Sequence, residues 1–156
     1  MDFAHGVLPS HHFSLEAFNV LVTEKQDEIY TLAYLILGDK LAAEKVVQSA
    51  LVQAYFDLNS GNTKPFDWLV YRALTAVIKV ELRRKDRDSL EGKFISDDIH
   101  LSALNGFRGL HPDLRLIIAL VDVAGLDYEQ AADILGIHVR QVRRKLAQAR
   151  YLMDVR

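Results

Sequence analysis

The chain has 156 residues, a formal net charge of −2 and no cysteine. This length allows one domain or two small ones, and without cysteine there are neither disulfides nor thiolate metal sites. Half of the residues are apolar, which is enough for a core, but no apolar run reaches the length of a membrane span. Because the first residues do not resemble a secretion signal, we expect a cytoplasmic protein.

The charge is distributed unevenly along the chain. Residues 1–80 hold nine acidic against six basic residues, whereas basic residues concentrate between Arg83 and Arg87 and again between Arg140 and Arg156. This asymmetry says more about binding partners than the total charge does, because local basic clusters attract polyanions.

Helical periodicity begins at Ser14, after residues 1–13, which we expect to form a loose arm. Three histidines in this arm allow a metal site as an alternative, but adjacent histidines do not easily converge on one ion without further ligands. Ser14 can cap a first helix, and a second helix follows with an apolar stripe from Ile29 to Leu37. Gly38 and Asp39 then end the second helix and cap a third.

The third predicted helix has a regular apolar stripe from Ala43 to Leu58. Its opposite face carries Lys45, Gln48, Ser49, Val52 and Phe56. Two apolar side chains on a face that should be polar indicate a protein partner, although single exposed apolar residues are common.

A fourth helix is predicted from Pro65, after a polar loop at residues 59–64. This helix is apolar around much of its circumference, so we expect it to be central and Trp68 to be a core residue. A basic ridge nevertheless runs along it and suits phosphate contact; it consists of Arg72, Lys79, Arg83 and Arg87, with Arg84 beside it.

Residues 88–100 are charged and rich in small side chains, and we interpret them as a flexible linker. A last helical unit is predicted from about Leu101, with a further helix beginning at Pro112. Because no strand pattern of useful length appears, the chain is predicted to be all-α. We expect two small domains, an N-terminal helical bundle at 14–87 and a C-terminal four-helix domain at 101–156.

The C-terminal domain is predicted to contain a helix-turn-helix. Asp127 and Gln130 have the spacing of a capping box, and Gly136 can end the first helix in the left-handed conformation. The second helix places Val142, Leu146, Ala149 and Met153 on an inner face. No acidic residue occurs from Ile134 to Met153.

The outer side of this second helix is basic and polar. We predict that it enters the DNA major groove, through His138, Arg140, Gln141, Arg143, Arg144, Lys145 and Gln148. The alternative is a solvated basic face on an ordinary helical hairpin. Cap, small residues, turn glycine and basic face all fall at helix-turn-helix spacing, which favours DNA binding.

These residues also resemble a known family. Leu110, Pro112 and Arg115, the run from Gly125 to Ala132, and the segment from Leu135 to Ile137 are similar to the C-terminal promoter-reading domain of bacterial extracytoplasmic-function (ECF) sigma factors. The N-terminal part resembles the other conserved domain of that family; its signs are Leu37-Gly38-Asp39, Ala43-Glu44, Val47-Gln48, Ala54-Tyr55, Trp68-Leu69 and Leu82-Arg83-Arg84.

The resemblance implies a transcription initiation factor that binds core RNA polymerase and directs it to promoter DNA. It assigns Lys45, Gln48, Ser49 and Val52 to the polymerase contact, and Phe56 extends that face. The loop at residues 59–64 would hold an unstacked base, and the ridge through Arg83 and Arg84 would hold duplex backbone. An inhibitory protein of the anti-sigma type is a further candidate partner.

The chain departs from the family in its N-terminal domain. Ala42, Lys45 and Ser49 stand where acidic residues are usual, and Thr75 and Lys79 replace polar Asn and Asp. Each lost charge-assisted hydrogen bond would weaken polymerase binding by about 1–2 kcal/mol. The alternative function is therefore a divergent DNA-binding or protein-interaction regulator that does not form a productive holoenzyme.

An enzyme is the weakest interpretation of this sequence. It has no glycine loop that would cradle phosphate, no metal-ligand spacing and no carboxylate pair that helix surfaces leave unexplained. We therefore expect no catalytic residue, no metal, no cofactor, no small-molecule substrate and no membrane association.

Overall fold

The computed structural model describes residues 14–88, 106–107 and 109–154, and these ranges contain helices and no strand. The elements are α1 Leu15–Leu37, α2 Lys40–Asn59, α3 Phe66–Asp88, α5 Pro112–Ile118, the π-helical turn η1 Ala119–Val123, α6 Tyr128–Leu135 and α7 Val139–Asp154. The all-α prediction is confirmed. The arm at 1–13, the linker beyond residue 88 and the helix predicted near Leu101 lie outside the described residues.

The first two predicted helices are one continuous helix, α1, so the prediction of a break was wrong. Ser14 caps it as expected, with its hydroxyl accepting a hydrogen bond from the Ala17 amide at 3.1 Å. Residues 23–28 are polar but contain neither Gly nor Pro, so nothing in them stops a helix. The helix ends only at Gly38, which has a φ of 69° and can adopt this left-handed conformation without a Cβ penalty.

Helices α1, α2 and α3 form the N-terminal bundle. The apolar stripe predicted for α2 is buried or half-buried as expected, with Ala43, Val46 and Ala50 fully enclosed. Asp39 begins α2 by accepting a hydrogen bond from the Ala42 amide, and this bond holds the pKa of the Asp39 carboxyl below its usual range. Because α2 is capped at its start and packed along one side, its other side faces outward.

The C-terminal helix-turn-helix forms as predicted. Asp127 accepts a hydrogen bond from the Gln130 amide at 2.8 Å, and the Gln130 side chain accepts one from the Asp127 amide at 3.0 Å. Gly136 ends α6 with a φ of 66°. Val142, Leu146 and Ala149 are buried, while Met153 is partly buried. Helix α7 is therefore held at a fixed angle to α6.

The start of α7 depends on a second reciprocal cap, which uses His138. Its Nδ1 accepts a hydrogen bond from the Arg140 amide at 3.2 Å, and the Gln141 side chain accepts one from the His138 amide at 3.1 Å. An imidazole nitrogen here does the work of the usual Ser or Thr oxygen. The cap also fixes where Arg140 leaves the helix backbone.

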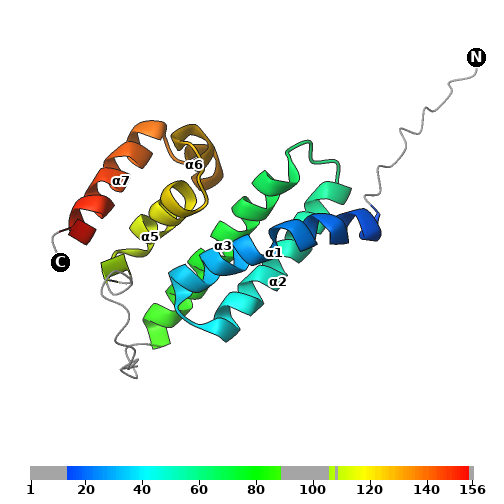
Figure 1. Cartoon of the computed structure of the whole chain (residues 1–156), viewed down its shortest axis with the longest axis horizontal. Helices are drawn as coiled ribbons and strands as arrows, with labels where there is room; N and C mark the ends of the chain where they lie inside the picture. The colour runs from blue at the N-terminus through cyan, green and yellow to red at the C-terminus, as the bar shows by residue number, and fades with distance from the viewer. Residues whose placement is uncertain (1–13, 89–105, 108, 155–156) are drawn as a thin grey trace, which may run out of the picture.

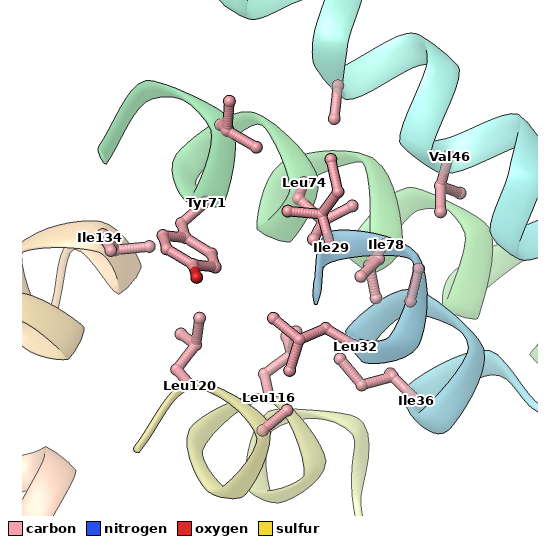
Figure 2. Close-up of a cluster of buried hydrophobic side chains, with 14 of the residues drawn as sticks. Ile29, Leu32, Ile36, Val46, Tyr71, Leu74, Ile78, Leu116, Leu120 and Ile134 are labelled. Carbon is pink, nitrogen blue, oxygen red and sulfur yellow. The ribbon is translucent and has the colours of Figure 1, made fainter. Parts of the chain in front are cut away.

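The two halves of the chain share one hydrophobic core. Figure 1 shows α5 lying between α7 and the N-terminal helices, with α7 on the outer side. In Figure 2, Tyr71 from α3, Leu120 from η1 and Ile134 from α6 converge. Nearby, Leu116 of α5 meets Leu32 of α1, and both side chains are 1% exposed. The halves are therefore packed together and not only tethered.

A polar contact reinforces this packing. The guanidinium of Arg115 donates to the backbone oxygen of Ile36 at 3.1 Å and to that of Leu110 at 2.9 Å. It thus satisfies a carbonyl at the end of α1 and another just before α5. Arg115 joins the two halves at the end of α1 opposite the chain start.

The cap of α7 can be tested by substitution. We expect His138→Ala to lower the free energy of unfolding by about 0.5–2 kcal/mol, because the Arg140 amide loses its acceptor. His138→Ser should retain most of the stability, because a hydroxyl can accept the same bond. Urea denaturation followed by circular dichroism measures both. Equal losses for the two variants would show that the imidazole contributes by packing and not as a cap.

Candidate nucleic-acid interface

The outer face of α7 carries an open set of polar and basic side chains. Its exposed residues include His138, Arg140, Gln141, Arg143, Arg144 and Gln148. The buried Val142, Leu146 and Ala149 lie on the opposite side of the helix. Burial thus separates the two faces as the sequence indicated, and packing of the two halves leaves the basic face uncovered. The contact of these exposed α7 side chains with DNA stays a prediction.

The basic residues of α7 do not all face the same way. Lys145 is half-buried and lies 3.5 Å from the Asp113 carboxylate of α5. Arg150 binds Asp122 of η1, with Nε 3.1 Å from Oδ2, and this bond raises the pKa of its guanidinium. The Arg143 guanidinium lies 5.9 Å from the centre of the Tyr128 ring. Arg140 and Arg144 are therefore the cations best placed to enter a groove.

The basic ridge predicted on α3 is only partly present. Arg72, Arg83 and Arg84 are exposed. Arg84 binds Glu81 with an Nη2–Oε1 distance of 2.6 Å, and this hydrogen bond lowers the pKa of the Glu81 carboxyl. Lys79 instead lines a small cavity with Asp113 and Lys145, because α5 packs beside it. Lys79 and Lys145 thus face the seam between the halves, and the Arg87 side chain lies outside the described residues.

Trp68 packs against the core, but it is not fully enclosed there as the sequence predicted. It is half-buried in the first turn of α3, and its Nε1 donates to the Asp133 carboxylate of α6 at 2.7 Å. Lys64 lies 3.4 Å from the same carboxylate and 4.9 Å from the centre of the indole ring, and the Arg72 guanidinium lies 5.2 Å from that centre. An indole has an apolar ring and a polar N–H edge, which suits a position between the core and solvent.

A cavity of about 500 Å³ lies next to this contact, between the two halves. Its walls include Trp68, Tyr71, Leu126 and Ile134. The Tyr71 hydroxyl donates to Glu28, and burial together with this bond raises the pKa of the phenol. Within the described ranges, no cluster of His, Asp and Glu is arranged to hold a metal ion.

The outer face of α2 is open along its length. Lys45, Gln48 and Ser49 are exposed, and Val52 and Phe56 are 56% and 62% exposed. Leu41, which the sequence pattern did not single out, is 78% exposed and lies on the same face, one turn before Lys45. Ala42, in contrast, is buried, so it cannot contribute to a contact on this face.

Comparison with known proteins identifies the C-terminal unit. Residues 104–153 match the family described as Sigma-70, region 4. This span contains α5, η1 and α6 and all but the last residue of α7. The match therefore coincides with the helix-turn-helix and the helices that support it.

Relatives extend the similarity over most of the chain. The ECF RNA polymerase sigma-E factor of Escherichia coli K12 is 29% identical over 167 aligned positions, which cover 89% of this chain and 85% of the relative. The ECF RNA polymerase sigma factor SigE of Mycolicibacterium smegmatis is 23% identical over 88% of this chain. The chain spans only 60% of the length of that relative.

Two solved structures share the fold. The sigma factor RpoE of Bartonella quintana, crystallised with the anti-sigma factor NepR, superposes with a TM-score of 0.76 at 20% identity, over 90% of this chain and 96% of that one. CnrH in complex with the cytosolic domain of CnrY gives a TM-score of 0.72 at 21% identity. The two superpositions cover 90% and 92% of this chain, so each includes the N-terminal bundle as well as the helix-turn-helix.

No helix in the part of the chain that the structure describes is both long and apolar enough to cross a membrane. The capped helix-turn-helix, the N-terminal bundle and the sequence matches all agree with the resemblance found in the sequence. Over most of its length the chain is similar to extracytoplasmic-function sigma factors, and its residues 104–153 match the sigma-70 region 4 family.

Proposed function

We propose that this protein is a transcription initiation factor that binds core RNA polymerase and directs it to particular promoters. The observation that carries this proposal is the geometry of α7, whose basic face is exposed while its apolar face is locked against α5 and α6. A rigid helix that presents Arg and Gln side chains fits the major groove and can read base edges there.

The residues that would read the promoter are those that leave α7 outward. Arg140 and Arg144 lie four residues apart, about one helical turn, and can each form bidentate bonds to guanine. Gln148 can bond adenine or phosphate, whereas Gln141, whose Oε1 accepts the His138 amide, keeps only its side-chain N–H donors for such a contact. His138 acts chiefly through the cap, because its Nδ1 is already engaged by the Arg140 amide. Lys145 is better placed to hold Asp113 than to contact bases.

The polymerase contact is proposed for the outer face of α2. Val52 and Phe56 are large apolar side chains left in water on a helix whose inner face is fully packed. Burying such side chains in a protein interface would contribute about 1.5–3 kcal/mol each, which can offset the acidic contacts that the chain lacks at Lys45 and Ser49. The face thus suits a partner contact that is more apolar than the family's usual one.

The N-terminal bundle would also contact DNA. Arg83 and Arg84 at the exposed end of α3 are placed to neutralise backbone phosphates. The loop before α3 would receive an unstacked base of the opened promoter. These are positioning contacts and carry little sequence information of their own.

The remaining parts of the proposal concern partners and location. The protein would act in the cytoplasm by binding alone, with no catalytic step, cofactor or small-molecule substrate. One of the two similar solved structures is a complex with the anti-sigma factor NepR and the other a complex with the cytosolic domain of CnrY, which supports an inhibitory protein partner here. The relatives give no support to a regulator that fails to form a holoenzyme.

Promoter reading by Arg144 has a measurable signature. We expect Arg144→Ala to reduce the preference for cognate over random duplex DNA by about 1–3 kcal/mol, because a base-edge contact is lost. Arg83→Ala should instead weaken binding to both duplexes equally. Arg150→Ala, which removes the same charge from the side of α7 held by Asp122, is the control. Equal losses on cognate and random DNA for Arg144→Ala would remove that residue from the reading face.

Polymerase binding can be tested on the outer face of α2. We expect Val52→Asp to reduce retention on immobilised core polymerase at least about tenfold, because a charge would be placed in an apolar contact. Val20→Asp on α1 is the matched control, since Val20 is 59% exposed and Val52 56%. In vitro transcription from the protein's own upstream region gives the functional readout.

Two outcomes would contradict the proposal. If both Asp variants lost polymerase equally, the outer face of α2 would have no special role. If the wild-type chain bound promoter DNA but was not retained on core polymerase, the protein would be a DNA-binding regulator and not an initiation factor.

A further inference from the structure

A negatively charged group of this chain occupies what would otherwise be an anion site. The site consists of the Lys64 ammonium, the Trp68 indole and the Arg72 guanidinium, and we call it the indole site. Asp133 of α6 enters it from the other half of the chain, 65 residues away, and accepts the Trp68 N–H at 2.7 Å. Both Lys64 and Trp68 donate to the same Asp133 carboxylate oxygen.

The indole site has the chemistry of a single-stranded nucleic-acid contact. Aromatic rings accept stacked bases without regard to sequence, and nearby cations neutralise the phosphates. Both cations lie close to the ring, at 4.9 Å for Lys64 and 5.2 Å for Arg72. Without Asp133 the site would present two positive charges and an indole N–H donor with no acceptor. A phosphate oxygen could take the position that the carboxylate oxygen now holds.

We propose that Asp133 acts as an intramolecular substitute for nucleic-acid phosphate, so that closure of the two halves and binding of single-stranded DNA at the indole site exclude each other. The proposal deepens the proposed function, because it rests on the loop before α3 meeting an opened promoter strand. It adds that the first helix of the DNA-reading motif controls access to that loop.

The location of Asp133 supports this competition. Asp133 lies on α6, and α6 is joined to α7 by the turn at Gly136, so any displacement of Asp133 larger than a side-chain rotation moves the whole helix-turn-helix. The apolar seam alone does not require an acidic residue here. The ion pair is half-exposed, with side-chain exposures of 49% for Lys64 and 54% for Asp133, so an incoming phosphate can reach it from solvent.

Competition for one site implies reciprocal coupling. Single-stranded DNA that displaces Asp133 opens the chain, and any variant that opens the chain at Asp133 binds single-stranded DNA more tightly. Loss of a charged hydrogen bond of this kind changes an equilibrium by about tenfold. Two variants should therefore act with opposite signs on DNA binding, although both open the chain.

The experiment measures the distance between the halves and the affinity for a twelve-residue oligothymidine in parallel. Because the chain has no cysteine, Glu44→Cys on α2 and Ala147→Cys on α7 give a unique pair of labelling sites for energy transfer. DNA affinity is measured on the unlabelled chain at fixed low salt by fluorescence anisotropy.

Asp133→Asn should lower the equilibrium constant for closure about tenfold and tighten oligothymidine binding by several-fold. Lys64→Gln should also lower the closed population, but it should weaken oligothymidine binding, because Lys64 belongs to the site itself. Glu129→Gln is the matched control: Glu129 is exposed on the same helix, and no ion pair joins it to another described residue. It should leave both the distance and the affinity within about twofold of wild type.

The proposal is overturned if Asp133→Asn and Glu129→Gln change oligothymidine binding equally, since only net charge would then matter. It is also overturned if Asp133→Asn leaves the distance between the halves unchanged. Failure of the proposed function is separate: a chain that shows the opposite signs of Asp133→Asn and Lys64→Gln, yet does not support transcription with core polymerase, keeps the competition and loses the initiation role.

Discussion

The arrangement of this molecule depends on the apolar seam between α1 and α3 on one side and α5, η1 and α6 on the other. Leu32, Tyr71 and Leu116 are nearly inaccessible to solvent, and each such side chain contributes about 1.5–3 kcal/mol when fully buried. The seam uses α5 and α6 as its contact elements and leaves α7 free, because α7 packs on α5 and α6 from the far side. A chain that must read DNA with its last helix can therefore be compact without hiding that helix. What the seam does cover is the start of α3, where Trp68 lies.

The sequence was most informative where a local pattern decides the structure. The Asp127–Gln130 cap, the left-handed Gly136 and the buried face of α7 follow from residues within a few positions of one another, and all three were predicted correctly. The inner and outer faces of α2 were equally clear, because a regular stripe of small apolar residues leaves little choice of rotation. The break predicted within α1 was wrong, because residues 23–28 contain neither Gly nor Pro and only Gly38 supplies a stop.

Contacts between distant residues could not be predicted from local patterns. Trp68 was assigned to the core from its apolar neighbours, but its indole N–H bonds to Asp133, which lies 65 residues later. Lys79 and Lys145 belong to predicted basic faces by helical spacing, yet Asp113 and the packing of α5 draw them to the seam. His138 stands where Ser or Thr is the usual cap of this helix, and the Gln141 three residues later was the signal that the histidine caps in their place. In each case helical phase gave the direction of the side chain and tertiary packing gave its partner.

The negative charge of DNA therefore affects the Asp133 carboxylate in two ways. Asp133 lies on the helix that supports the reading helix, where an acidic side chain near duplex phosphates would be unfavourable, and it is neutralised there by Lys64 and the Trp68 N–H. When the halves separate, Asp133 loses these partners while the indole site gains access to solvent. Opening still exposes the apolar seam, but a nucleic acid lowers the polar part of the cost, because phosphates replace the carboxylate at the indole site and Arg140 and Arg144 keep the field around the helix-turn-helix positive. A single-stranded nucleic acid thus favours the open chain through the indole site, whereas in its absence the seam and this one ion pair favour closure.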